Sequence, residues 1–252
     1  MTPKRLVVRG LGAFARTVAA QAQPPLAAKS PQSAAKTTYS IFARSSIVAA
    51  PVHHVRGPLN RTDSIVVATQ TSVTVLLSGG LDSTACLAFY MKQDFAVEGL
   101  FFDFGQASAT REEDAARAIA RHYGAGLRCV RCEGLHPRTG VEVRGRNGFL
   151  LLGALMALQG EAGIIGIGIH EGTSYADCTE NFIQESQHLF DLYTDGQVRI
   201  GAPFIKWTKR QIWDYGQFAS IPVALTYSCE LGRDQPCGEC LSCKDLTALY
   251  AC

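Results

Sequence analysis

The sequence predicts an α/β protein: a parallel sheet covered by helices on both faces, followed by a small C-terminal lobe. Three observations support this prediction. Apolar, strand-like runs alternate with helix-like segments between residues 73 and 218, and this alternation is typical of parallel sheets. A Ser-Gly-Gly turn follows the first run, at the edge where such sheets bind ligands. Four cysteines crowd into residues 229–243, which indicates a lobe held by a metal.

The first half of the pattern gives three strands and two helices. VTVLL (73–77) is a short, β-branched apolar run that ends in a glycine-rich turn, so it predicts a buried strand. Apolar residues at helical spacing predict a helix over 83–91. FAVEGLFFDFG (95–105) predicts a second buried strand. An amphipathic helix stopped by a glycine is expected over 108–123, and LRCVRC (127–132) predicts the third strand.

The second half repeats the alternation. NGFLLLGALMALQG (147–160) predicts an apolar helix, and GIIGIGI (163–169) predicts a buried strand with several glycines. A helix is expected over 180–193. VRIGAP (198–203) predicts the last strand, and TKRQIWDYGQF (208–218) the last helix.

Charge is unevenly distributed along the chain. Residues 1–72 hold nine of the 24 Lys and Arg residues and one of the 22 acidic residues, so residues 73–252 hold 15 basic and 21 acidic ones. The part that carries the motifs is therefore mildly acidic, which argues against bulk nucleic-acid binding. No apolar run reaches the ~18 residues of a transmembrane helix, so we expect no membrane span.

Residues 1–70 are rich in Ala, Ser, Arg and Lys, and we expect a basic, disordered extension there. Two alternatives stay open. A leader rich in Arg and Ser and poor in acids is typical of organelle transit peptides, or translation begins later, near Ser72. We therefore expect a cytoplasmic protein, with organelle targeting as the alternative.

SGGLDS (78–83) lies between the first strand and the first helix. In such a turn several backbone N–H groups point at one position, and the helix N-terminus adds partial positive charge, so an anion is favoured. Asp82 beside an anion is explained if it holds Mg²⁺ or caps the helix. The loop lacks the Gly-Lys-Ser/Thr of a Walker loop. A plain turn with an aspartate cap is the alternative.

The cysteine cluster reads SCELGRDQPCGECLSC (228–243). Thiolates at this density suit tetrahedral zinc, so we predict one structural zinc ion per chain, held by Cys229, Cys237, Cys240 and Cys243. An iron–sulfur cluster is the alternative. Disulfides are disfavoured because nine cysteines is an odd number and no secretory signal precedes them. The other five cysteines are expected to be mostly buried core residues.

SGGLDS resembles the pyrophosphatase loop (PP-loop) of the ATP-using N-type synthetases, which include NAD, GMP and asparagine synthetases and tRNA-modifying enzymes. With the cysteine spacing added, the chain is similar to the 7-cyano-7-deazaguanine synthase family of queuosine biosynthesis. Further segments of that family occur in the same order: FDFGQ (102–106), GRN (145–147), SYADC (174–178), AP…TK (202–209) and TYSC (226–229). The likeness covers about residues 73–250.

The resemblance implies a Rossmann-like, adenine nucleotide α-hydrolase-like domain over 71–226 and a four-cysteine zinc lobe over 227–252. It also implies an ATP-dependent C–N ligase that converts 7-carboxy-7-deazaguanine and ammonia to the nitrile 7-cyano-7-deazaguanine (preQ0). Adenylation suits this reaction because a carboxylate oxygen is a poor leaving group, and a second activation of the amide permits its dehydration. The implied cofactors are ATP, Mg²⁺ and Zn²⁺. The implied partners are a small deazapurine acid, free ammonia and a second copy in a homodimer.

Site residues follow from the same resemblance. ATP is expected to contact Leu77, Ser78, Gly79, Gly80, Leu81, Asp82, Ser83, Thr84, Asp103 and Gln106. The expected catalytic residues are Asp82 near Mg²⁺, and Arg146 and Lys209, which would neutralise phosphate charge. The expected substrate residues are Tyr175, Asp177 and Cys178, with Asp177 accepting hydrogen bonds from a guanine-like ring. Without the resemblance, Asp103 reads equally well as a strand-end cap, and both cations as surface residues.

The resemblance is loosest on the acceptor side. The family pattern has an Asn-x-x-Asp element and a Pro-Asp-Cys-Arg string there, whereas this chain has HEGTSYADCTEN (170–181). The segment before GRN is also short. Two alternatives follow: a PP-loop paralogue that adenylates a different carboxylate or modified base, and a non-catalytic nucleotide- and zinc-binding interaction protein. Asp82 argues against the second, because simple binding does not need a magnesium carboxylate.

Overall fold

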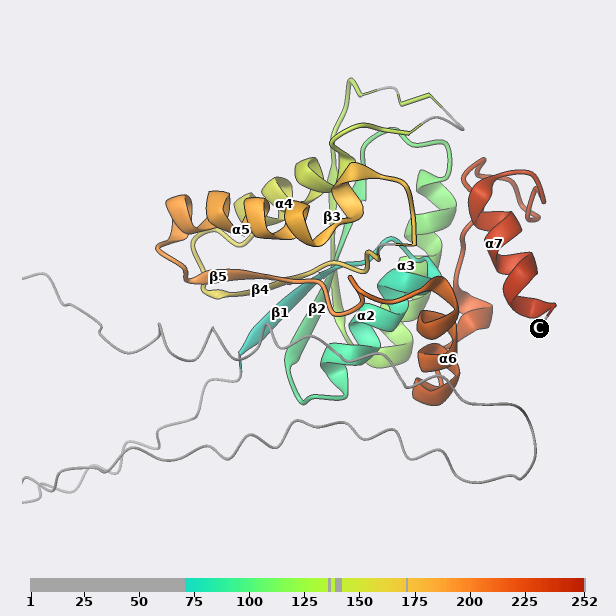
Figure 1. The fold of residues 1–252 in the computed structure, drawn as a ribbon, viewed down its shortest axis with the longest axis horizontal. Helices are drawn as coiled ribbons and strands as arrows, with labels where there is room; N and C mark the ends of the chain where they lie inside the picture. The colour runs from blue at the N-terminus through green and yellow to red at the C-terminus, as the bar shows by residue number, and fades with distance from the viewer. Residues whose placement is uncertain (1–70, 136, 139–141, 171, 252) are drawn as a thin grey trace, which may run out of the picture. The chain divides into compact units, whose positions relative to one another are not determined.

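The computed structural model describes residues 71–135, 137–138, 142–170 and 172–251. The extension expected over residues 1–70 lies outside them. The described chain forms a five-stranded parallel sheet in the order β3-β2-β1-β4-β5, which confirms the predicted α/β class (Figure 1). Its strands are β1 (Ser72–Leu76), β2 (Ala96–Asp103), β3 (Gly126–Arg131), β4 (Gly163–Gly166) and β5 (Val198–Gly201).

Helices follow the strands as the sequence predicts, with one addition. They are α2 (Leu81–Met91), α3 (Ala109–Tyr123), α4 (Arg146–Ala157), α5 (Glu180–Thr194), α6 (Lys209–Ala219) and α7 (Leu241–Tyr250), with 3₁₀ turns η1 (Ala176–Cys178) and η2 (Val223–Leu225). The added helix is α7, which the sequence analysis left unassigned. Six of its ten residues are Leu, Cys, Ala or Tyr, but they lie within and directly after the cysteine cluster, which was interpreted as a metal-binding lobe. Figure 1 shows α4 and α5 on one face of the sheet, and α2, α3 and α6 on the other.

Two apolar cores result, one on each face of the sheet. Along β1, Val73 and Val75 are fully buried against α2 and α3, whereas Leu76 belongs to the core beneath α4 and α5. Phe101 and Phe102 on β2 divide between the two cores in the same way. This division follows from the strand geometry, because successive side chains point to opposite faces. The central strands are covered on both faces, which explains their nearly continuous apolar sequences.

The C-terminal segment packs on the sheet domain through α7. Leu249 joins the core that contains α2 and α6, and the rings of Trp213 and Tyr250 meet edge to face with centroids 5.0 Å apart. This packing brings the predicted zinc lobe against the α/β unit. The boundary at residues 226–227 stays a prediction.

The strand order creates a switch point between β1 and β4. The chain proceeds from β1 outward to β2 and β3, then crosses back to place β4 on the other side of β1. Connections therefore leave β1 and β4 in opposite directions, and a crevice opens beyond their carboxyl ends, where ligands bind in folds of this kind. SGGLDS begins two residues after β1 ends.

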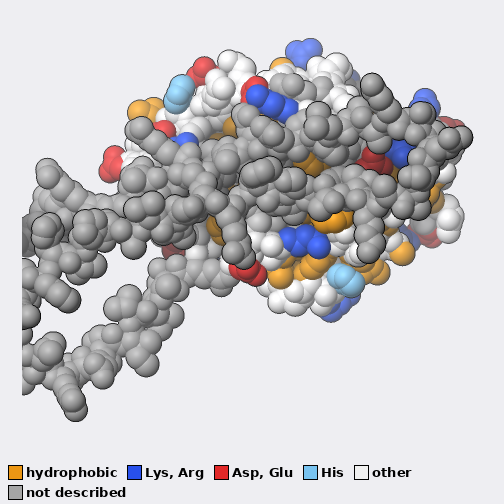
Figure 2. Space-filling view, turned by 60° about the horizontal axis from the view of Figure 1, so that its bottom comes forward, with side chains coloured by type: hydrophobic (Ala, Val, Ile, Leu, Met, Phe, Trp, Pro, Cys, Tyr) orange, Lys and Arg blue, Asp and Glu red, His pale blue; other side chains and the backbone are white. Residues whose placement is uncertain are grey.

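No helix in the described part of the chain is long and apolar enough to cross a membrane. On the face drawn in Figure 2, the visible Lys, Arg, Asp and Glu side chains are scattered among apolar and polar ones.

Candidate active site

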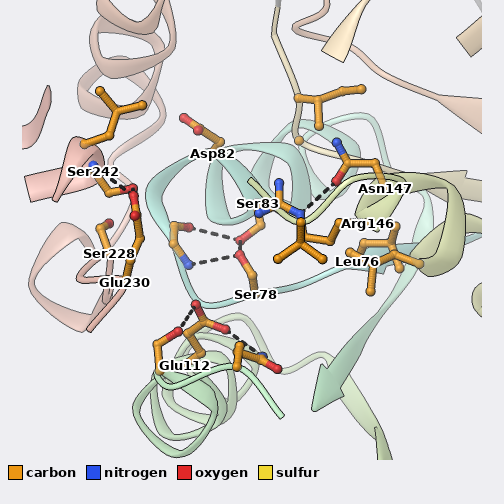
Figure 3. Close-up of a pocket in the computed structure, with 18 of the residues that line it drawn as sticks. Leu76, Ser78, Asp82, Ser83, Glu112, Arg146, Asn147, Ser228, Glu230 and Ser242 are labelled. Carbon is orange, nitrogen blue, oxygen red and sulfur yellow. Dashed lines mark hydrogen bonds between the residues drawn. The ribbon is translucent and has the colours of Figure 1, made fainter. Parts of the chain in front are cut away.

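A pocket of about 700 Å³ opens at the switch point. Its floor is the start of α2, where Ser78, Asp82 and Ser83 lie at the centre of the view in Figure 3. One wall is the start of α4 with Arg146, and the opposite wall is the cysteine lobe with Glu230 (Figure 3). Residues separated by more than 150 positions therefore meet around one cavity.

The loop at the floor is held by its own hydroxyl groups. The Oγ atoms of Ser78 and Ser83 lie 3.1 Å apart, and Ser83 and Thr84 both donate to the carbonyl of Gly80, at 3.1 and 2.8 Å. Gly80 occupies the N-cap of α2 and has no side chain to accept the first-turn N–H groups. The N-terminus of α2 thus presents donors and partial positive charge to the pocket, which is the environment an anion requires.

Asp82 lies in the first turn of α2 but does not cap it. Its Oδ2 accepts a hydrogen bond from Lys209 Nζ at 2.5 Å and lies 3.9 Å from His170 Nε2. Its Oδ1 is buried and has no hydrogen-bond partner among the described residues. A buried carboxylate oxygen without a partner is costly, and oxygen is the ligand that Mg²⁺ prefers. The geometry of Asp82 therefore fits a magnesium ligand.

His170 is fixed beside this carboxylate in one tautomer. Its Nδ1 accepts the backbone N–H of Gly172 at 3.0 Å, so Nε2 carries the proton of the neutral ring and faces Asp82. Burial lowers the pKa of His170, partly offset by Asp82. The Nε2–H of His170 thus faces Asp82 Oδ2 but lies beyond hydrogen-bond distance, at 3.9 Å.

Two cations stand at helix starts that face the pocket. Arg146 is the first residue of α4, and Lys209 is the first residue of α6. Cations at helix N-termini are disfavoured by the helix dipole, and neither helix has an acid in its first turn. Helix stability therefore explains neither placement. The Asp82 carboxylate accounts for Lys209, and an anion in the pocket would account for Arg146.

The start of α4 is joined to the 3₁₀ turn η1 through Asn147. Its backbone N–H donates to Asp177 Oδ2 at 3.1 Å, and its Nδ2 donates to the Asp177 carbonyl at 3.0 Å. The same Nδ2 lies 3.6 Å from Cys178 Sγ. Burial raises the pKa of the Cys178 thiol. Asn147 therefore fixes Asp177 and Cys178 relative to Arg146.

Most of the expected site residues surround this pocket. It is lined by Leu77, Ser78, Gly80, Leu81, Asp82, Ser83, Gln106, Arg146, Tyr175, Asp177, Cys178 and Lys209. Gly79 and Thr84 are not among the residues that line the pocket. Asp103 does not line the pocket, and its Oδ1 accepts the N–H of Gly105 at 3.0 Å. Asp103 thus adopts the strand-end cap arrangement, which was the alternative for this residue.

The four cysteines of the C-terminal lobe come together. The Sγ atoms of Cys229, Cys237, Cys240 and Cys243 all lie within 4.8 Å of one another, and all four are free thiols. The backbone N–H groups of Glu239 and Cys240 donate to Cys237 Sγ at 3.4 and 3.3 Å. Four sulfur ligands supported by amide hydrogen bonds fit tetrahedral zinc.

The local environment favours the thiolate form of part of this cluster. Burial raises the pKa of Cys229, but hydrogen bonds from the amides of Cys237, Leu231 and Arg233 bring it to about 6. Amide hydrogen bonds from Cys240 and Glu239 lower the pKa of Cys237. Burial raises the pKa of Cys243 to about 12. A divalent cation would supply the positive charge that stabilises a buried Cys243 thiolate.

Sequence reasoning missed many of the residues that line the pocket, among them Glu112, Asn147 and Tyr227. Asn147 carried a usable signal, because a polar residue follows Arg146 at the start of an otherwise apolar helix. Glu112 lies in the first turn of an amphipathic helix, where acids are ordinary. Tyr227 contacts the loop through its backbone N–H, which donates to the Gly79 carbonyl at 2.9 Å. No residue pattern reveals a contact made by the backbone.

Comparison with known proteins agrees with this site. The family model for queuosine biosynthesis protein QueC matches residues 72–140 and 133–250. A 7-cyano-7-deazaguanine synthase of Synechococcus sp. (strain CC9311) is 33% identical over 206 residues, which cover 70% of this chain and 91% of that protein. The protein of the same name from Methanothermobacter thermautotrophicus is 31% identical over 198 residues, covering 67% and 89%.

Solved structures with a similar fold include an NMN synthetase from Francisella tularensis, with a TM-score of 0.46 and 14% identity over 70% of this chain and 74% of that one. A 4-thiouridine synthetase in complex with RNA and ATP gives a TM-score of 0.43 and 14% identity over 72% and 50%.

The parallel sheet, the matched family model and the relatives named as synthases together define an α/β enzyme of the synthase class. More narrowly, the chain belongs to the queuosine biosynthesis protein QueC family.

Proposed function

We propose that this chain uses ATP to convert 7-carboxy-7-deazaguanine and ammonia to 7-cyano-7-deazaguanine. Family membership and the names of the relatives support this reaction. The structural observation that supports it most strongly is the arrangement at the pocket floor. There, the uncapped start of α2 lies beside Asp82, whose Oδ1 is buried without a partner among the described residues and whose Oδ2 is held by Lys209.

The phosphates of ATP are assigned to the start of α2. Backbone N–H groups around residues 78–83 would hold the departing pyrophosphate, aided by the helix dipole. Arg146 and Lys209 would neutralise the charge that develops as pyrophosphate leaves. Mg²⁺ held by Asp82 Oδ1 would further neutralise phosphate charge. Such a site accelerates the reaction by positioning and electrostatics.

Two activations by ATP account for an acid becoming a nitrile. In the first, a carboxylate oxygen attacks the α-phosphate, pyrophosphate leaves, and ammonia displaces AMP to give the amide. In the second, the amide oxygen attacks another ATP, pyrophosphate leaves again, and loss of AMP and two protons gives the nitrile. One phosphate site serves both steps. Tyr175, Asp177 and Cys178 are proposed to hold the deazapurine ring at the opposite end of the pocket.

The cysteine lobe is proposed to hold one structural Zn²⁺ per chain. Its four sulfur atoms, within 4.8 Å of one another, support this assignment. Since metal binding supplies folding free energy to such sites, Cys240→Ser should lose the zinc and loosen residues 227–252. Elemental analysis of the purified variant tests this, and full zinc occupancy would overturn it. Because free thiols are typical of a reducing compartment, we propose that the protein is cytoplasmic. We further propose that it is a homodimer and that it uses free ammonia.

The decisive experiment supplies the acid, ammonium, ATP and Mg²⁺ to the purified protein and weighs the product by mass spectrometry. We expect the nitrile mass, with two AMP released for each nitrile. No amide or nitrile from the carboxylic acid, together with no AMP, would refute the proposal.

A different acceptor is the second candidate, and the acceptor-side sequence HEGTSYADCTEN supports it. Asp177 Oδ2 already accepts the N–H of Asn147, which leaves it fewer free positions for a guanine-like ring. A panel of deazapurine and purine acids, assayed for AMP release, separates the candidates. Release with another acid alone would favour the paralogue. A protein that binds ATP but releases no AMP with any acid would instead be a non-catalytic binding protein.

A further inference from the structure

We propose that the cysteine lobe positions the phosphate loop, and that Tyr227 is the positioning residue that connects them. This inference rests on the proposed role of residues 78–83 as the ATP phosphate site. It assigns the lobe a part in ATP binding, beyond holding the C-terminal segment together.

The first link is a backbone hydrogen bond. The N–H of Tyr227 donates to the carbonyl of Gly79 at 2.9 Å. On its other side, Gly79 is pressed against α3: a Cβ there would lie 2.6 Å from the Glu112 carbonyl oxygen and 2.8 Å from Ala115 Cβ. The loop is therefore held between α3 and the segment that leads to Cys229.

The second link fixes Tyr227 itself. Its hydroxyl donates to the carbonyl of Arg233 at 2.8 Å, across a turn of six residues. That turn is seated on the start of α3, because a Cβ at Gly232 would overlap the carbonyl of Ala107. Arg111 of α3 also pairs with Asp234 of the turn. The position of Tyr227 thus follows the position of the turn.

The third link joins the turn to the sulfur cluster. The N–H of Gly232 donates to the carbonyl of Cys229 at 3.3 Å, so the turn that holds the Tyr227 hydroxyl is closed on a residue of the sulfur cluster. Glu230 Oε1 accepts both the N–H and the hydroxyl of Ser242, at 3.2 and 2.8 Å. This bond ties the segment of Cys229 to the start of α7, next to Cys240 and Cys243.

These links have a functional consequence because amides that hold a phosphate act through precise placement. A displacement of about 1 Å at such a site costs on the order of a hundredfold in rate. If the four sulfur atoms separate, the turn, Tyr227 and then Gly79 lose their fixed positions. ATP binding should weaken before the sheet unfolds.

The test replaces one hydroxyl. Tyr227→Phe removes the bond to Arg233 but keeps the N–H that binds Gly79. Losing one such bond should raise the Kd for a fluorescent ATP analogue about three- to tenfold, and hydrogen exchange at residues 78–83 should become faster. Zinc content should stay at the wild-type value. Tyr250→Phe is the matched control, since Tyr250 is exposed on α7 of the same lobe, and it should leave Kd and exchange unchanged.

A wild-type Kd and wild-type exchange in Tyr227→Phe would overturn the proposal. Chelation of the metal gives a second readout: we expect a rise of at least about tenfold in Kd, reversed by added zinc, while circular dichroism of the sheet persists. Unchanged affinity in folded, metal-free protein would also overturn it. If metal removal unfolds the chain, the Tyr227→Phe result decides.

These outcomes are separable from failure of the proposed function. The binding assay contains no acid and no ammonia, so a protein that makes no nitrile can still show the coupling. If the wild-type protein does not bind ATP, the proposed function fails. Hydrogen exchange at residues 78–83 in Tyr227→Phe would then still report whether the lobe positions the loop.

Discussion

The first turns of α2 and α3 border the same pocket and each carries an acid, but the two acids are treated differently. Glu112 on α3 accepts Ser108 Oγ at 2.8 Å and Gln106 Nε2 at 3.0 Å, one on each carboxylate oxygen. Asp82 on α2 accepts Lys209 on one oxygen, while the other is buried without a partner among the described residues. Glu112 completes a local network, whereas one oxygen of Asp82 is left without a hydrogen-bond partner among the described residues.

This difference separates a structural carboxylate from a functional one. A protein gains stability when its buried polar groups have hydrogen-bond partners. A buried polar group without a partner therefore indicates a site where a ligand supplies the missing interaction. The composition of the two turns gives no such distinction. It depends on what faces each oxygen, which only the folded chain determines.

The largest expected effect is on turnover. Asp82→Asn keeps the shape of the side chain but removes its charge, so the proposed Mg²⁺ and Lys209 lose their partner. We expect AMP release to fall about 10²- to 10³-fold, as for the loss of one preorganised electrostatic group. Glu112→Gln should lower it no more than about tenfold, because an amide can still accept one of the two hydrogen bonds. Steady-state assays of both variants test the comparison, and equal losses would erase the distinction drawn here.

The second effect concerns the glycine that lies between the two turns. Gly79 has φ +79°, and a Cβ there would collide with the Glu112 backbone. Gly79→Ala should therefore cost about 2–4 kcal/mol, from crowding and left-handed strain together. Gly124 has a similar φ of +65° at the end of α3, but nothing among the described residues lies within 4 Å of its Cβ position. Gly124→Ala should cost about 1 kcal/mol.

Chemical denaturation of the two glycine variants gives both free energies. Their difference measures the crowding alone, since the strain is shared. Gly79→Ala should also weaken binding of the ATP analogue, and Gly124→Ala should not. Similar costs for the two would mean that the loop can move away from α3.

The start of α4 gives a third case, with a smaller effect. Asn147 is buried and bonds to Asp177 through its backbone and its side chain. Asn147→Ala removes the side-chain bond and leaves the Asp177 carbonyl without it, which should cost about 1–3 kcal/mol. Asn181→Ala on the exposed face of α5 is the control and should change stability little. A Tm of Asn147→Ala equal to that of the control would show that Asn147 is dispensable.

The fold was predictable from sequence because each strand and the helix that follows it have a local pattern of apolar residues. β1 through α6 follow in the expected order, with Leu100, Phe101 and Phe102 marking a strand covered on both faces. α7 was not predicted because its N-cap Cys240 and its residue Cys243 were interpreted as part of a metal-binding lobe. The four cysteines were predictable because they lie close in sequence, whereas Glu112 and Tyr227 become site residues only through contacts made by folding.

The smallest effect belongs to Glu113, the neighbour of Glu112. Its carboxylate pairs with Arg117 at 2.6 Å and with Arg131 at 2.7 Å. The hydrogen bond from Arg117, aided by Arg131, lowers the pKa of Glu113 from its usual 4.5. A lowered carboxyl pKa stabilises the fold above the unfolded-state value, and this contribution is lost as pH falls through the folded-state value.

Glu113→Gln should therefore lower Tm at pH 7 by no more than about 3 °C, because surface ion pairs contribute little. The gap to wild type should narrow as pH falls below 4.5. Glu133→Gln, at an exposed position, serves as the control and should show no gap at any pH. Thermal scans from pH 7 to pH 3 test this. A gap that persists at pH 3 would mean that Glu113 stabilises the fold through packing and that its ion pairs do not cause the difference in Tm.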